Sequence, residues 1–133
     1  MDLAFDFHEL TRQLVPDPEG IELRIWAEFS VVARGERVIQ DDLFPVLEFA
    51  FASQNWIQAV QTAPEDFVFE ERISIHRHGK VWRLKDDMFP LEAIVEALDL
   101  FYLKLREAVS AEFGIDLDAF AARGDRMPRS RLQ

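Results

Sequence analysis

The order of strand-like and helix-like segments predicts an α+β protein, in which a small antiparallel sheet packs against two main helices. Apolar and polar side chains alternate along residues 21–31, as on a strand with one buried face. Two longer segments, about 43–61 and 90–113, have the apolar spacing of helices. Between them, residues 67–85 hold two alternating runs around a glycine, which is the pattern of a β-hairpin.

Residues 1–14 fit either a strand or a helix. A strand would place one alternating apolar set on a single face: Leu3, Phe5 and Phe7. A helix would align a different set, spaced by three and four residues: Phe7, Leu10 and Leu14. The PDPEG run at 16–20 should end either element, because two prolines and a glycine continue neither a helix nor a central strand.

The strand at 21–31 has an apolar face and a polar face. Its apolar face carries Ile21, Leu23, Ile25, Ala27, Phe29 and Val31. Trp26 lies on the polar face among charged neighbours, where either the second helix or a binding partner should cover it. Gly35 then opens a turn, and a short returning strand should begin at Arg37.

The helix at about 43–61 is apolar around much of its circumference. Such a helix is either the central buried element or part of a subunit interface, and we favour burial. Asp41 or Asp42 is the expected N-cap, with Pro45 in the first turn.

The helix at about 90–113 has a continuous apolar stripe and should end at Gly114, after which Asp116 can cap a short helix at 117–123. Two of its leucines lie off that stripe, among carboxylates: Leu100 and Leu103. Single exposed leucines are normal, but a pair one turn apart also suits a contact such as a homodimer.

The hairpin at 67–85 should turn at His78-Gly79. That register gathers four apolar side chains on one face: Ile73, Ile75, Trp82 and Leu84. Carried to the strand ends, it sets carboxylates opposite each other, Glu70 with Asp87 and Glu71 with Asp86. Like charges in such positions destabilise a hairpin, so these pairs indicate either fraying or a negative patch kept for a partner.

The charge of the chain limits its partners. Fifteen basic and 25 acidic side chains give a formal net charge of −10, which excludes a generic nucleic-acid-binding surface and disfavours anionic lipid. Residues 121–133 hold four arginines and one aspartate, a net of +3, so the other 120 residues carry −13. We expect a single domain over 1–122 and a basic, flexible tail over 123–133. The acidic body serves either solubility or a basic partner.

Nothing in the sequence indicates a membrane or an oxidising compartment. No apolar run approaches the ~20 residues of a membrane span, and the first residues lack the basic region of a signal peptide. The absence of cysteine excludes disulfides and thiolate chemistry. We therefore expect a cytoplasmic protein.

No spacing in the sequence points to catalysis. The serines lack a G-x-S-x-G setting, and the five glycines are too isolated for a phosphate-binding loop. His76 and His78 form an H-x-H pair, but the expected turn at His78 separates their directions. Glu71 shares the parity of apolar neighbours, so it is either a buried functional acid or a strand-end residue that reaches solvent or an arginine. We expect no enzyme, no cofactor and no metal.

A strand with Glu and Trp, then PVLEFAFASQNWIQAV, then a charged hairpin ending in VWRL resembles small acidic bacterial proteins, among them immunity proteins of polymorphic toxin systems. The resemblance covers roughly residues 20–90. It implies a non-enzymatic inhibitor that binds a basic toxin, with steering by charge. The natural contacts would be Glu65, Asp66, Glu70, Glu71, Asp86 and Asp87, together with Trp26.

Two alternatives stay open. One is a homo-oligomeric structural or adaptor protein with Leu100 and Leu103 at its interface. The other is a small-ligand-binding protein with a pocket near Glu71 and His76.

Overall fold

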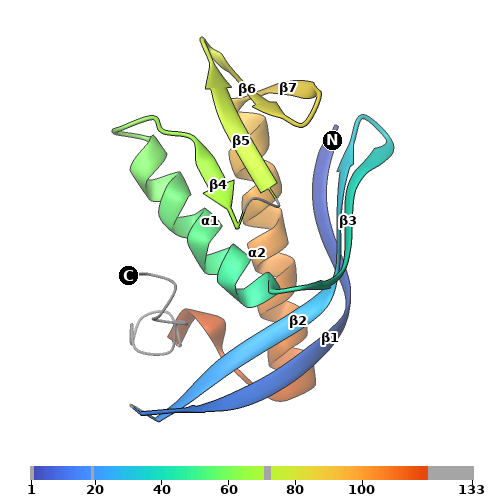
Figure 1. The fold of residues 1–133 in the computed structure, drawn as a ribbon, viewed down its shortest axis with the longest axis vertical. Helices are drawn as coiled ribbons and strands as arrows, with labels where there is room; N and C mark the ends of the chain where they lie inside the picture. The colour runs from blue at the N-terminus through green and yellow to red at the C-terminus, as the bar shows by residue number, and fades with distance from the viewer. Residues whose placement is uncertain (1, 19, 71–72, 120–133) are drawn as a thin grey trace.

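The chain folds as an α+β protein with two antiparallel sheets and two main helices (Figure 1). The computed structural model describes residues 2–18, 20–70 and 73–119. In chain order the elements are β1 (Leu3–Asp17), β2 (Gly20–Ala33), β3 (Glu36–Phe44), α1 (Val46–Val60), β4 (Phe67–Phe69), β5 (Ile73–His78), β6 (Val81–Leu84), β7 (Asp87–Pro90) and α2 (Leu91–Phe113). The predicted fold class is confirmed, with two sheets in place of one.

The N-terminal segment is a strand, and its alternating apolar set is buried: Leu3, Phe5 and Phe7. It pairs with β2 in a long antiparallel ladder, in the sheet order β1-β2-β3. The register shifts between His8 and Thr11, where Glu9 adopts a φ of 59° in a bulge. The expected apolar face of β2 is buried from Leu23 through Val31.

The PDPEG run ends the first element, as expected, but the end falls inside the run and not before it. β1 continues through Pro16 to Asp17, and β2 begins at Gly20. Pro16 lies opposite Ile21 in the ladder. The sheet tolerates this proline because β1 is an edge strand, where a missing N–H removes no central hydrogen bond.

The helix α1 begins later than expected, at Val46 with Pro45 as its N-cap residue. Asp41 and Asp42 are not caps, because both lie in β3. The β2–β3 ladder continues to Phe44, opposite Ala27, so pairing with β2 holds this segment extended. The choice between burial and a subunit interface is decided for burial, since nine residues of α1 are buried within the chain.

The second sheet has the order β4-β5-β6-β7. Its central hairpin turns one residue later than expected, at Gly79-Lys80, with His78 opposite Val81. Gly79 takes the positive φ, 63°, and His78 stays in the strand. The shift preserves parity, so the four expected side chains still share the buried face: Ile73, Ile75, Trp82 and Leu84.

The predicted pairing of carboxylates across this hairpin is wrong. β6 ends at Leu84, the chain turns through Lys85, whose φ is 57°, and β7 returns with Asp87 opposite Leu84. β5 pairs on its other side with β4, so Glu70 lies in the β4–β5 turn, two strands away from β7. Glu71 lies outside the described residues. The inference drawn from that charge clash therefore does not hold.

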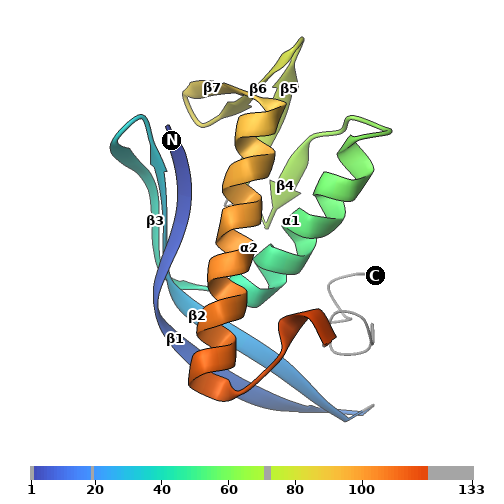
Figure 2. The same ribbon diagram turned by 180° about the vertical axis from the view of Figure 1, so that it is seen from behind.

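The two helices form one layer and the strands form the other. In Figure 1 strands pass in front of α2, and in Figure 2 α2 lies in front of them. The predicted end of α2 is confirmed, because Gly114 adopts a left-handed φ of 67°. Asp116 caps the next short helix, accepting the N–H groups of Asp118 and Ala119. The predicted end of that helix and the tail at 123–133 lie outside the described residues.

An aromatic cluster joins the layers. Phe49 of α1 lies at its centre, with ring centroids 5.3 Å from Phe101 of α2 and 5.4 Å from both Phe29 and Phe69, one from each sheet. Phe44, at the end of β3, stacks on Phe29 at 4.0 Å. Both sheets thus share one core with both helices.

A candidate protein-binding face on the helical layer

The carboxylates expected to bind a partner do not form one patch. Glu65 and Asp66 precede β4 and lie at the end of the second sheet that holds the Gly79-Lys80 turn. Glu70 and Asp86 lie in turns at the opposite end. The antiparallel order of the strands separates the two groups, which sequence proximity alone did not show.

Asp66 and Asp87 are engaged within the chain. The Oδ2 of Asp66 lies 2.8 Å from the Nδ1 of His76, and its Oδ1 accepts a hydrogen bond from the backbone N–H of Arg77 at 2.9 Å. The N–H of Arg77, and then His76, keep the pKa of Asp66 below its ordinary value. Asp87 lies 3.4 Å from the Nε of Arg34, which reaches it from the β2–β3 turn. Both carboxylates therefore contribute to local structure.

Trp26 is half-buried on the face of the first sheet that points away from the helices. Its Nε1 donates a hydrogen bond to the Oε1 of Gln13, on the neighbouring strand, at 3.2 Å. The expected cover by a helix is therefore wrong, because strand parity turns Trp26 away from the helical layer. Contact of Trp26 with a partner stays a prediction.

The outward side of α2 combines exposed leucines with carboxylates. Leu100 is 54% exposed and Leu103 is 41% exposed, as their position off the apolar stripe predicts. The carboxylates beside them are also exposed: Glu92, Glu96 and Asp99. We call these five residues the α2 face. Their spacing of three or four residues aligns them along one side of the helix.

The α2 face has no basic side chain within it. Residues 91–103 contain three carboxylates and no lysine or arginine, and α1 contains neither basic residue type. The next cations along α2 already have partners, since Lys104 contacts Asp6 and Arg106 donates to Asp118 at 2.9 Å. Asp99 accepts a hydrogen bond from the amide of Gln54 at 3.2 Å. Within the part of the chain that the structure describes, the negative charge of this face is thus not neutralised by a cation of either helix.

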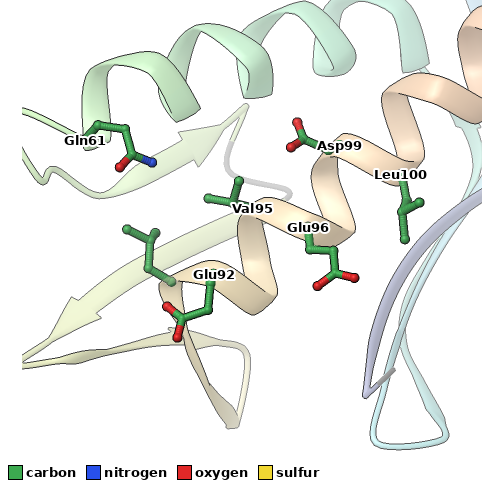
Figure 3. A pocket seen from close by; sticks show the side chains of 7 residues that line it. Gln61, Glu92, Val95, Glu96, Asp99 and Leu100 are labelled. Carbon is green, nitrogen blue, oxygen red and sulfur yellow. The ribbon is translucent and has the colours of Figure 1, made fainter.

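A hollow of about 380 Å³ lies where the end of α1 meets the first half of α2. Its lining includes most of the α2 face and adds Gln61, Leu91 and Val95. Figure 3 shows Gln61 across from Val95 and Asp99, with the other carboxylates around the opening. We call this cavity the α1–α2 hollow. Val95 and Leu91 are half-buried, so it has an apolar wall and an acidic rim.

Sequence reasoning missed Gln61, Val95 and the three carboxylates of the α2 face as site residues. A signal for the carboxylates was present, because Glu92, Glu96 and Asp99 recur at helical spacing. No comparable signal existed for Gln61, which meets α2 only through the crossing of the two helices. The pocket considered near His76 is not where the hollow lies.

Comparison of the chain with protein-family models, curated proteins and solved structures finds no match. Among residues 2–18, 20–70 and 73–119, neither helix has the length and apolar character needed to cross a bilayer. Within the same residues, no three histidine, aspartate or glutamate side chains gather as metal ligands would.

Proposed function

We propose that this chain is a non-enzymatic protein-binding module whose helical layer takes a basic protein partner. The α2 face carries the proposal, because it places two exposed leucines beside three carboxylates that no cation among the described residues of the two helices neutralises. Interfaces of this kind combine an apolar contact that excludes water with charges that guide association.

An inhibitor of the immunity type is the specific case we favour. The acidic body, −13 without residues 121–133, would accelerate encounter with a basic toxin by electrostatic steering. Exposed carboxylates on a rigid helix can occupy positions that the phosphates of a substrate would take on a basic nuclease. We therefore propose α2 as the contact surface, in place of the sheet turns that the sequence suggested.

The experiment compares two triple variants of the tagged full chain in capture from its own host. One neutralises the α2 face with Glu92→Gln, Glu96→Gln and Asp99→Asn. The matched control neutralises three carboxylates of the sheet turns with Glu65→Gln, Glu70→Gln and Asp86→Asn. Both sets remove three charges, so a difference between them reports position and not net charge.

We expect the unaltered chain and the control to retain one basic protein that salt releases. The α2 variant should bind that protein about tenfold more weakly, from roughly 0.5 kcal/mol for each exposed ion pair. Loss of binding in the control alone would return the contact to the sheet turns. Capture of no basic protein by the unaltered chain would refute the proposed function.

A further inference from the structure

The α1–α2 hollow has the two features that a long cationic side chain requires. Leu91 and Val95 form an apolar wall against which an alkyl stem can lie. Glu92 and Glu96 stand at the rim, and within the described part of the chain neither carboxylate forms a hydrogen bond or an ion pair. Lysine and arginine bury their stems in this way while the charged end stays at a polar edge.

Arginine fits this chemistry better than lysine. Its planar guanidinium can donate to two carboxylates at once and is more weakly hydrated than an ammonium group. Gln61 adds an amide oxygen on the α1 side of the hollow, which can accept a further N–H. Leu100 continues the apolar surface from the hollow onto the α2 face. The α1–α2 hollow and the adjoining Leu100 are thus complementary, in charge and in polarity, to an arginine that has apolar neighbours.

A second copy of the chain does not supply that arginine from the same face. If two α2 helices packed antiparallel with Leu100 on Leu103, residues whose numbers sum to 203 would meet. Asp99 would then face Lys104, but Glu96 would face Glu107, a repulsive pair. Lys104 and Arg106 are also engaged with Asp6 and Asp118. Among the described residues of α2, charge complementarity therefore favours a different, basic protein over packing of this face on its own copy.

We infer that the α1–α2 hollow receives an arginine side chain of the partner, with the neighbouring apolar residues of that partner on Leu100 and Leu103. This inference rests on the proposed function and adds that the partner is anchored by an arginine. Buried arginines are frequent anchors of protein interfaces because they combine area with directed hydrogen bonds.

The test uses two short peptides on the full chain with labelled methyl groups. One is a blocked Ala-Ala-Arg-Leu-Ala peptide, and the other replaces the arginine with citrulline, its neutral analogue of similar shape. We expect the arginine peptide to shift the methyl signals of Leu91, Val95 and Leu100 in NMR spectra. Citrulline should bind at least about threefold more weakly, the loss of one half-exposed charge contact.

Two variants locate the effect. Glu96→Gln should weaken arginine-peptide binding about threefold, whereas Glu112→Gln, the same change on an exposed residue at the far end of α2, should not. Equal shifts with both peptides, equal binding by both variants, or no shift near the hollow would overturn the inference.

The remaining outcomes separate this inference from the proposed function. Shifts of the same methyl signals with protein concentration alone, together with a doubled mass in light scattering, would assign the groove to a second copy and overturn the inference. Capture of a basic partner that Glu96→Gln leaves unchanged would overturn the hollow as its anchor but retain the proposed function. If the hollow binds the arginine peptide but the chain captures no basic protein, the hollow is an arginine site and the proposed protein-binding function is refuted.

Discussion

Asp118 shows how one side chain fixes the segment that follows α2. Its carboxylate accepts hydrogen bonds from the hydroxyl of Tyr102 at 3.0 Å and from Arg106 at 2.9 Å, both on α2. Leu117 beside it is fully buried. The chain after Gly114 is therefore held in place by apolar packing, which includes Leu117, and by two hydrogen bonds from α2 to Asp118. Sequence patterning predicted the cap at Asp116 but not this pairing, because Asp118 and Tyr102 lie sixteen positions apart.

Tyr102 should titrate well above an ordinary tyrosine. Partial burial, followed by the hydrogen bond to Asp118 and its negative charge, raises the pKa of Tyr102 to about 12. A raised pKa means that the neutral phenol stabilises the folded state. That contribution is complete below the ordinary pKa of 10.0 and is lost as the pH rises through 12. Because Tyr102 is the single tyrosine, the ultraviolet absorbance of phenolate reports it alone.

We expect a titration midpoint near 12 while circular dichroism shows the fold intact. Asp118→Asn should move the midpoint toward the ordinary value, and burial should keep part of the elevation. Glu107→Gln, which alters a more distant carboxylate of the same helix, serves as the control. A midpoint at the ordinary tyrosine value in the folded protein would contradict the hydrogen bond between Tyr102 and Asp118.

The β5–β6 hairpin shows what patterning decides about an element and what it leaves open. Alternation assigned the buried set, from Ile73 to Leu84, because side-chain parity is a local property of a strand. It could not choose between turns at His78-Gly79 and Gly79-Lys80, since both frames keep the same parity. Pairing with β4 and β7 on either side sets the observed frame.

Substitutions at the turn distinguish the two frames. Gly79→Ala should lower the free energy of unfolding by about 1 kcal/mol, because Gly79 holds a positive φ. A Cβ there meets no atom within 4 Å, so the cost is conformational and not steric. His78→Gly should also lower it, by about 0.5–1 kcal/mol, since glycine weakens a strand. Urea unfolding measures both, and a gain from His78→Gly would restore the turn at His78-Gly79.

At the scale of the whole molecule, Arg34 connects the two sheets. It lies in the β2–β3 turn, and its Nη2 donates to the carbonyl of Met88 in β7 at 2.7 Å. Its guanidinium also stacks over Phe89 at 4.9 Å and pairs with Asp87. A turn of the first sheet thus holds the last strand of the second. Nothing in the sequence pattern marks Arg34, because its partners in β7 are more than fifty positions away.

Arg34→Ala should lower the free energy of unfolding by about 1 kcal/mol, a value discounted for the half-exposed side chain. Hydrogen exchange of the β7 amides should accelerate in the same variant, since the contacts of Arg34 hold that strand. Arg37→Ala removes another exposed arginine from the same hairpin and should change stability by less than about 0.5 kcal/mol. Equal effects of the two substitutions would show that Arg34 does not join the sheets.

The sequence by itself determined the fold class, the buried faces of β2, β5, β6 and α2, the end of α2 at Gly114 and the exposure of Leu100 and Leu103. Each follows from periodicity or backbone preference within a few residues. Only the tertiary structure decided that the N-terminal segment is a strand, that β7 returns beside β6, and that Gln61 meets Val95 across the α1–α2 hollow. These depend on pairing between distant segments, where burial and hydrogen bonding select among conformations that the local chain allows equally well.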